Sequence, residues 1–435
     1  MKPPIGKRTL AAAALPLVLS LLLVGCGQPY EVARASAPRD TSPDASAAEM
    51  SELVAGNNAF AFSLYQAVRE GQEGNFIYSP YSISLAAAMV YAGARGETEQ
   101  QMADALHFTL PQERLHPAFN ALELALASRG ADPGLFRSGD FELAIANAVW
   151  AQRSYPFRED YLDILARDYD AEVNLVDFQN ESGTVPGIVN EWVRDATEGK
   201  ITDVLGPESV TIRTRLLLMS AVYFFGRWED PFPPRNTENG TFYLLDHSEA
   251  SVPMMNQDGI STQCFVGEEG LQVVELPYQG GELAMVIVLP GREQFTAFEG
   301  TLDAEGFGEI LDSLERCVVT LSMPRFEVES DFGLAHTLSE MGMPTAFDNM
   351  VADFSGMADF EPEERLYISA VEHQARIEVN EEGAEAVAGT VIVVRELCSE
   401  TPPPVEIVVD HPFIFAIIDR ATGTILFVGR VLDPR

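Results

Sequence analysis

The side chains that most often carry out chemistry are scattered along this sequence without the spacing that a catalytic or metal site needs. No H-E-x-x-H, G-x-S-x-G or glycine-rich phosphate-binding pattern occurs, and Lys200 is the only lysine beyond residue 8, so no S-x-x-K arrangement exists. Acidic pairs such as Glu381-Glu382 say little about acid–base catalysis in a chain so rich in carboxylates. The histidines stand singly, at His107, His116, His247, His336, His373 and His411. We therefore expect no catalytic residue, no metal and no cofactor, and no motif supports an enzyme.

The charge balance excludes one class of partner. The chain has 435 residues, of which 66 are acidic and 28 are lysine or arginine, for a formal net charge of −38. Nucleic-acid binding depends on lysine and arginine contacts to phosphates, so no nucleic-acid partner is expected. The acidic surface is instead typical of a well-hydrated, soluble body, and a hydrophobic content of 46% is enough for a large core.

The first 26 residues are typical of an export signal. Lys2, Lys7 and Arg8 precede an apolar run over residues 10–24, which has the length of a signal-peptide core and is short for a membrane-spanning helix. Leu23-Val24-Gly25-Cys26 resembles the lipobox of bacterial lipoproteins. That resemblance implies cleavage before Cys26, lipidation of Cys26, and an extracytoplasmic protein tethered to a membrane of the cell envelope, periplasmic or on the cell surface. The alternative is an ordinary secretory signal with an incidental cysteine.

The following segment predicts a linker. Residues 27–51 are rich in Ala, Ser, Pro and Asp and lack apolar periodicity, which indicates a disordered tether. The predicted organisation is a signal peptide at 1–25, a lipidated cysteine and tether at 26–52, and one domain at 53–435. Cys264, Cys317 and Cys398 have no C-x-x-C spacing, so neither a zinc site nor a redox dithiol is indicated. One disulfide can form among them in an oxidising compartment, and the sequence does not select the pair.

Hydrophobic patterns along residues 53–435 predict an α+β domain, because helical patterns dominate early and strand patterns late. Amphipathic helices are expected at 53–70 and 82–106, the second starting after Ser79-Pro80. Buried or half-buried strands are expected at residues 216–225, 283–289, 317–323, 407–409, 413–418 and 424–431.

Residues 380–404 combine the features of a loop and a strand. Small residues and glycines precede a β-branched run at 390–394, and three prolines follow at 402–404. Charges at 384–395 fall only on Glu385 and Arg395, both odd positions. The even positions are all small or apolar: Ala384, Ala386, Ala388, Thr390, Ile392 and Val394. Side chains alternate along a strand, so as a strand this segment would turn its even positions to a core.

This segment and five other motifs, in order along the chain, resemble those of the serpins, protease inhibitors that insert a cleaved loop into a sheet. The start of the segment resembles the serpin hinge, and coverage runs from about residue 53 to residue 435. The matching stretches are Asn75–Ile83, Asn147–Trp150, Asn190–Trp192 with Thr197–Ile201, Ala221–Trp228, Glu381–Ala386 and Asp410–Phe415.

The resemblance implies a single α+β domain with three β-sheets, about eight or nine helices and an exposed reactive-centre loop. A target protease would attack the loop as a substrate, and the cut loop would insert as a new central strand and trap the acyl-enzyme. The hinge would comprise Glu381, Glu382, Gly383, Ala384, Glu385, Ala386, Val387 and Ala388. Two positions depart from inhibitory members: Ala384 stands where Thr or Ser is usual, and Val387 is bulkier than the usual Ala.

The family spacing also implies a scissile bond. Counting 17 residues from Glu381 places Leu397 before the bond and Cys398 after it, which suits chymotrypsin-like or subtilisin-like proteases or some cysteine proteases. The alternative bond, Arg395–Glu396, would suit a trypsin-like protease. Target proteases are thus the expected partners of a monomeric inhibitor. A non-inhibitory serpin acting as a binding module is the first alternative, and an envelope hydrolase is the second.

Overall fold

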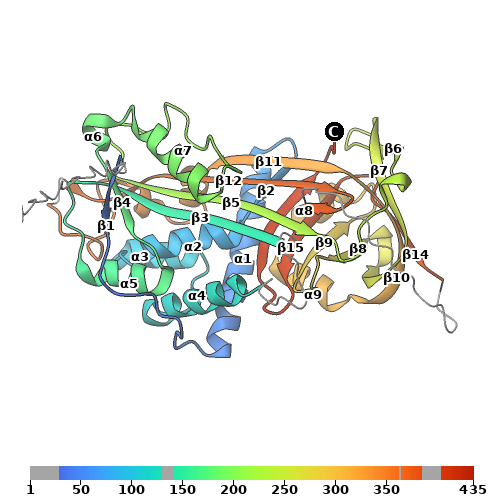
Figure 1. Cartoon of the computed structure of the whole chain (residues 1–435), viewed down its shortest axis with the longest axis horizontal. Coiled ribbons are helices and arrows are strands. Elements are labelled where there is room, and N and C mark those ends of the chain that lie inside the picture. Colours follow the sequence, from blue (N-terminus) through green and yellow to red (C-terminus); the bar gives the residue numbers. More distant parts are fainter. Residues whose placement is uncertain (1–28, 130–140, 362–363, 385–402) are drawn as a thin grey trace, which may run out of the picture.

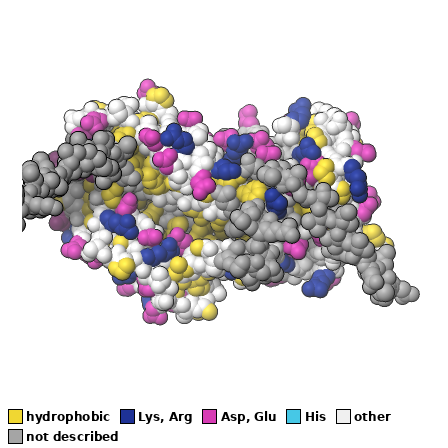
Figure 2. All heavy atoms as spheres, in the orientation of Figure 1, with side chains coloured by type: hydrophobic (Ala, Val, Ile, Leu, Met, Phe, Trp, Pro, Cys, Tyr) yellow, Lys and Arg dark blue, Asp and Glu magenta, His cyan; other side chains and the backbone are white. Residues whose placement is uncertain are grey.

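The computed structural model describes residues 29–129, 141–361, 364–384 and 403–435, and within them the chain forms one elongated α+β body (Figure 1). Helices cluster at one end and below a long sheet, and a second sheet occupies the other end. Acidic side chains are spread over the visible face among arginines, in keeping with the net charge (Figure 2). In these ranges no helix has both the length and the apolar character needed to cross a membrane.

Ten α-helices occur in the described ranges, one or two more than the eight or nine expected. They are α1 (Ala47–Gly71), α2 (Pro80–Tyr91), α3 (Gly96–Ala105), α4 (Gln112–Ala127), α5 (Glu159–Tyr169), α6 (Phe178–Glu181), α7 (Val185–Ala196), α8 (Phe295–Thr301), α9 (Ala304–Asp312) and α10 (Ala335–Glu340).

The single helix predicted over 82–106 is wrong, because α2 and α3 are separate helices. Gly93 packs so closely on Met357 that an added Cβ would lie 1.9 Å from its Cγ. Gly96 then begins α3 with φ +59°, a conformation that favours glycine. The observed helix starts two residues before the predicted one, at Pro80 rather than residue 82, because the Ser79 side chain caps α2 and Pro80 occupies its first position.

One of the two sheets has seven strands in the order β1-β4-β3-β5-β13-β12-β11. The strands β5 and β12 also pair directly and in parallel, with Ser220 opposite His373. Helix α2 packs on one face of this sheet and α7 on the other (Figure 1). Its strands are β1 (Glu31–Ala33), β3 (Phe141–Gln152), β4 (Val173–Val176), β5 (Leu216–Arg227), β11 (Phe326–Gly333), β12 (Ile368–Asn380) and β13 (Gly383–Ala384).

The remaining strands form a nine-stranded sheet with the order β14-β10-β7-β8-β9-β15-β16-β2, with β6 paired to β7. Hydrogen bonding thus gives two sheets rather than the three expected, because the long β7 pairs with β6 and β10 along most of its length and with β8 at its end. The three expected sheets correspond to the seven-stranded sheet and the two halves joined by β7. The strands are β2 (Phe76–Tyr78), β6 (Glu238–Tyr243), β7 (Glu249–Val266), β8 (Gln272–Pro277), β9 (Leu283–Leu289), β10 (Glu315–Pro324), β14 (Val405–Val408), β15 (Phe413–Asp419) and β16 (Ile425–Val431).

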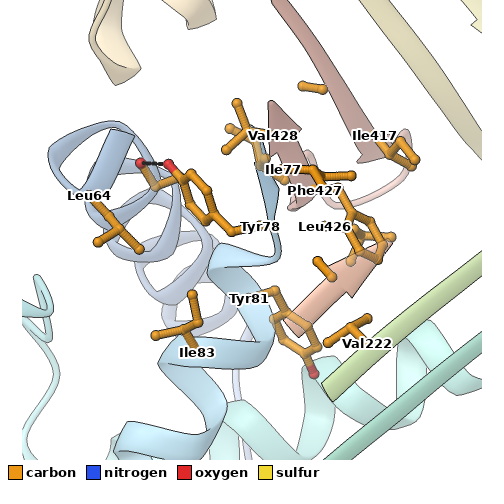
Figure 3. Packing of buried hydrophobic residues seen from close by; sticks show 14 of the residues in the cluster. Leu64, Ile77, Tyr78, Tyr81, Ile83, Val222, Ile417, Leu426, Phe427 and Val428 are labelled. Carbon is orange, nitrogen blue, oxygen red and sulfur yellow. Dashed lines mark hydrogen bonds between the residues drawn. The ribbon is translucent and has the colours of Figure 1, made fainter. Parts of the chain in front are cut away.

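The main core lies between α1, α2 and the two sheets. Figure 3 shows Ile77 and Tyr78 of β2 between α1 and the C-terminal strand β16, with Val428 and Phe427 packed alongside. The Tyr78 side chain is fully buried, and its hydroxyl donates a hydrogen bond of 2.6 Å to the Ala61 carbonyl. Because each large apolar side chain contributes about 1.5–3 kcal/mol when buried, this core is the main source of stability.

The disordered tether predicted over residues 27–51 is wrong for residues 29–51. Residues 31–33 form β1, which pairs antiparallel with β4, and α1 begins at Ala47 after a capping box formed by Ser46 and Glu49. Arg39 donates to Asn120 of α4 at 3.0 and 3.1 Å. Polar contacts and ladder hydrogen bonds thus order a segment that has little apolar periodicity. Residues 1–28, including Cys26, lie outside the described residues.

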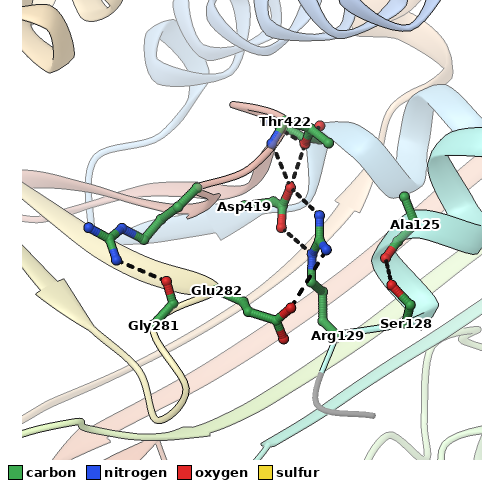
Figure 4. A network of polar contacts seen from close by, with 9 residues as sticks. Ala125, Ser128, Arg129, Gly281, Glu282, Asp419 and Thr422 are labelled. Atoms are coloured by element: carbon green, nitrogen blue, oxygen red, sulfur yellow. Dashed lines mark hydrogen bonds and ion pairs between the residues drawn. The ribbon is translucent and has the colours of Figure 1, made fainter. Parts of the chain in front are cut away.

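Two covalent or ionic links tie distant segments together. Cys264 of β7 and Cys317 of β10 form a disulfide, with Cα atoms 6.0 Å apart, which settles the pairing that the sequence left open. Arg129, just after α4, pairs with the fully buried Asp419 of β15 at 2.6 Å. Figure 4 shows Asp419 also accepting hydrogen bonds from Thr422, so that this buried carboxylate is fully engaged.

Candidate functional site

The start of the predicted hinge lies at the central junction of the seven-stranded sheet. Residues Gly383 and Ala384 form β13, which pairs antiparallel with the end of β12 and with the end of β5. Farther along, β5 and β12 pair with each other directly. Strand β13 therefore separates β5 and β12 only at their ends. We call β13 the wedge and the directly paired part of β5 and β12 the seam.

Gly383 is fixed in this position by its surroundings. Its φ of +141° is unfavourable for residues with a side chain, and a Cβ would lie 2.0 Å from the Gly226 carbonyl oxygen and 2.6 Å from the Arg227 Cα. Only glycine allows the backbone to approach β5 so closely. The glycine at this position of the predicted hinge thus has a steric basis.

Glu381 anchors the turn before the wedge. Its side chain is only 7% exposed, and its carboxylate pairs with Arg325 and accepts a hydrogen bond from Thr237. Burial raises the pKa of Glu381, but the hydrogen bonds from Arg325 and Thr237 outweigh this effect and hold the pKa below its ordinary value. The carboxylate is thus charged and paired at neutral pH.

Trp228, which follows β5, holds the same turn from the other side. Its indole Nε1 donates to the Asn380 carbonyl at 3.0 Å, and its backbone N–H donates to the Glu382 carbonyl at 2.9 Å. The ring is buried and stacks on Tyr278 with centroids 4.7 Å apart. Trp228 thus holds the end of β12 and the start of the predicted hinge in place through these two hydrogen bonds.

A buried polar chain crosses the middle of the seam. The His373 Nε2 accepts a hydrogen bond from the Ser79 N–H at 3.0 Å, so its proton lies on Nδ1 and donates to the Ser220 Oγ, also at 3.0 Å. Burial lowers the pKa of His373 to about 3, so the ring is neutral.

The chain continues away from His373 through hydroxyl groups. The Ser220 and Ser82 hydroxyls lie 2.9 Å apart, and the Ser82 hydroxyl donates to the Asn147 Oδ1 at 2.8 Å. This polar chain links β12, β5, α2 and β3 across the centre of the sheet.

The structure brings together only part of the predicted site. Glu381, Glu382, Gly383 and Ala384 lie at the junction of β5 and β12, as a hinge requires. The rest of the hinge and both candidate scissile bonds lie outside the described residues: Glu385, Ala386, Val387, Ala388, Arg395, Glu396, Leu397 and Cys398.

Sequence reasoning missed the roles of Arg325, Trp228 and His373 around that junction. Trp228 lay inside a motif already recognised, and the predicted strand around Ser220 could have indicated the seam. Nothing in the sequence marked Arg325. His373 is fully buried and both of its ring nitrogens have hydrogen-bond partners, so it is a satisfied core histidine. Within the described ranges, no group of three or more His, Cys, Asp or Glu side chains could hold a metal ion.

This geometry defines a class of proteins in which a sheet receives the start of a further segment between two of its strands. Comparison with known proteins gives the family. A family model described as "Serpin (serine protease inhibitor)" matches residues 55–434. The chain therefore belongs to the serpin family.

Two relatives support this assignment. The leukocyte elastase inhibitor of Homo sapiens is 35% identical and covers 88% of this chain and 100% of its own length. A serpin-like protein of the archaeon Thermococcus kodakarensis is 38% identical over 87% of this chain and 85% of its own length.

Solved serpin structures have the same fold. That of a highly specific serpin from the insect Tenebrio molitor superposes with a TM-score of 0.77 at 29% identity, covering 88% of this chain and 98% of its own. Uncleaved ovalbumin has a TM-score of 0.76 at 27% identity over 88% of this chain and 100% of its own.

Proposed function

We propose that this serpin is an inhibitor of serine-type endopeptidases that acts as a suicide substrate. The single observation that carries the proposal is the position of β13, already inserted as the first two residues of a strand between β12 and β5. The residues that follow it in the sequence are small at the next two even positions, Ala386 and Ala388. A cleaved segment with such side chains can extend the wedge along the seam without overpacking.

The register of β13 predicts where each inserted residue would lie. Val379 pairs with Ala384, and Gly226 pairs with Ala384 from the other side. Continuing both ladders places Ala388 between Ala375 and Val222. These two side chains face the main core and are fully buried. The even positions of the segment would therefore enter the core, as the alternation in the sequence predicts.

The same register places Thr390 between His373 and Ser220, at the centre of the seam. Strands in a sheet lie about 4.8 Å apart, so an added strand would separate these two side chains and break their hydrogen bond. A threonine hydroxyl both donates and accepts, so it can replace the lost contact on both sides. The polar chain would be extended rather than left unsatisfied.

The energetics favour such insertion. The strand would replace one parallel ladder between β5 and β12 with two antiparallel ladders, for a gain of about ten backbone hydrogen bonds at about 0.5–1.5 kcal/mol each. The gain of roughly 5–15 kcal/mol is comparable with the stability of a whole domain. Cleavage, which frees one end of the segment, would then be followed by spontaneous insertion.

Target, location and anchoring extend the proposal. Leu397–Cys398 is the proposed scissile bond, with chymotrypsin-like or subtilisin-like enzymes as targets, and Arg395–Glu396 with a trypsin-like target is the alternative. Lipidation at Cys26 would hold the monomeric inhibitor at the cell envelope, where secreted proteases act. The support for these statements is the residue pattern of the sequence.

The test is incubation of the full chain with equimolar chymotrypsin, subtilisin or trypsin. An inhibitor gives an adduct that survives SDS and releases a C-terminal peptide, and the mass of that peptide identifies the bond. A peptide beginning at Cys398 supports the Leu397 assignment. Cleavage without an adduct and without a rise in melting temperature would instead show a non-inhibitory binding module, and an unchanged chain that cleaves other substrates would show a hydrolase.

A further inference from the structure

A small cavity lies on the face of the seven-stranded sheet that α7 covers, next to the wedge. Its volume is about 60 Å³, and its lining residues come from β5, β12 and the turn after α7: Lys200, Tyr223, Phe224, Arg376 and Glu378. Tyr223 and Arg376 lie opposite each other in the seam, at the end nearest the wedge. Because a water molecule takes up about 30 Å³ in the liquid, the cavity has room for a carboxylate group and not for a larger ligand.

The turn after α7 holds Lys200 at this cavity. The Thr197 hydroxyl donates to the Val193 carbonyl at 2.8 Å and accepts a hydrogen bond from the Ile201 N–H at 3.1 Å, which fixes the backbone on both sides of the turn. The Lys200 ammonium donates to the Tyr223 hydroxyl at 3.2 Å and lies 4.7 Å from the centroid of its ring. The only lysine beyond residue 8 is therefore held over β5, beside the place where the wedge ends.

Glu385 is the residue that the register of β13 would bring to this cavity. In the ladder with β12, Ala384 lies opposite Val379, so the next residue, Glu385, would lie opposite Glu378. Residues directly opposite each other share a face of the sheet. Val379 is buried in the main core, whereas Glu378 is exposed and lines the cavity. The Glu385 side chain would therefore point to the face on which the cavity lies.

The charges around the cavity favour a cation as the partner of Glu385. Glu378 would be a like charge directly opposite, which destabilises a strand pair. Arg376 is already engaged by Glu327, with 2.7 Å between the guanidinium and the carboxylate. Without Lys200, Arg376 alone would face three carboxylates once Glu385 is in place. The Lys200 ammonium supplies the second positive charge.

We propose that the cavity receives the Glu385 side chain when the segment after β13 inserts, and that Lys200 positions the inserted strand by pairing with the Glu385 carboxylate. The occupant is thus a part of this chain, and the described residues reach to within one position of it, at Ala384. The inference rests on the proposed insertion and names the residue that fixes the register at its start. Because Glu385 directly follows the wedge, this pair would form before Thr390 reaches the middle of the seam.

The direct test is the crystal structure of the full chain after one cut in the reactive-centre loop by subtilisin or chymotrypsin. The Lys200 Nζ is expected within about 4 Å of a Glu385 carboxylate oxygen, on the face covered by α7. A longer separation, or a cut loop that does not insert, would overturn the proposal. The structure does not depend on adduct formation, so a chain that shows the pair but captures no protease would support this inference and contradict inhibition alone.

A double-mutant cycle separates pairing from a purely structural role of Lys200. Insertion must be faster than hydrolysis of the acyl-enzyme, so the readout is the ratio of captured to merely cleaved chain. Lys200→Gln should lower this ratio about threefold, but by less than about 1.5-fold in the Glu385→Gln background. Arg194→Gln, which removes a half-exposed cation of α7, is the matched control and should leave the ratio unchanged. An equal loss with and without Glu385→Gln would show that Lys200 only supports the fold and would overturn the proposal.

Discussion

The His373 imidazole donates a hydrogen bond of 3.0 Å to the Ser220 hydroxyl across the seam between β12 and β5. These are the two strands that must separate if the segment after β13 inserts. The contact therefore closes the sheet in the present state and marks the place that an inserted strand would occupy. At the end of these strands, the pair of Glu381 with Arg325 anchors the turn that precedes the first two residues of that strand, Gly383 and Ala384.

Replacing Arg325 should destabilise the folded chain more than replacing its partner Glu381. Glu381 is buried and Arg325 is 46% exposed on its side chain, so Arg325→Ala leaves a buried charge, whereas Glu381→Gln leaves a solvated one. We expect Arg325→Ala to lower the free energy of unfolding by about 1–3 kcal/mol and Glu381→Gln by less. Urea unfolding at pH 7 measures both. Equal losses would show that the pair does not anchor the hinge as described.

A side chain at residue 383 should destabilise β13 by more than the strain of a positive φ would alone, because it also clashes with β5. Gly383→Ala combines an unfavourable φ of +141° with a clash on the Gly226 carbonyl. Gly342 has φ +123° but no atom within 4 Å of a Cβ, so Gly342→Ala is the matched control. We expect Gly383→Ala to cost at least 1 kcal/mol more in thermal unfolding. A similar loss in both variants would mean that β13 shifts freely.

The buried neutral histidine should make stability depend on pH. The pKa of His373 is about 3 in the folded chain and near 6.5 when unfolded, so the unfolded state binds the proton first. Stability should therefore fall as the pH drops from about 6.5 toward 3. His373→Gln should reduce this slope by up to about 1.4 kcal/mol per pH unit. Urea titrations at pH 7 and pH 5 test it, and an unchanged slope would contradict the neutral, buried state.

Glu372 should affect the pH dependence of stability in the opposite direction to His373, so that its contribution to stability becomes more favourable as the pH falls. Burial and then the nearby Asp331 raise the pKa of Glu372 to about 7, so the folded state bears a cost when this carboxyl ionises. That cost is present above about pH 7 and disappears as the pH falls toward 4.5. Glu372→Gln should therefore raise the free energy of unfolding at pH 8, by about 1–2 kcal/mol, and leave it nearly unchanged at pH 4.5. Denaturant titrations at the two pH values measure the difference, and an equal gain at both would rule out ionisation as the cause.

The sequence predicted the strands of the core well because continuous apolar runs can be buried in only a few ways. The strand predicted at Leu283–Leu289 has the observed bounds, and those around residues 216–225 and 413–418 differ by one or two residues. The α+β class followed from the order of these patterns. The resemblance to a serpin hinge could be recognised because small residues and a glycine stand out next to a β-branched run, and the hinge itself stays a prediction.

Other features depend on tertiary contacts that local patterns do not record. The break after α2 arises from the contact of Gly93 with Met357, which is distant in the sequence. Residues 29–51 are ordered by contacts such as that of Arg39 with Asn120, although their composition indicates disorder. The anchoring of Glu381 likewise needs Arg325, whose role only the folded chain reveals.

The most direct test of the central claim compares Thr390→Arg with Val391→Arg in the full chain. If the segment inserts in the register of β13, Thr390 must enter the core between His373 and Ser220, whereas Val391 lies on the opposite face. With chymotrypsin or subtilisin, we predict that Thr390→Arg is cleaved without forming an SDS-stable adduct, while Val391→Arg still forms one. Equal adduct formation by both variants, or loss of the adduct only in Val391→Arg, would contradict the account.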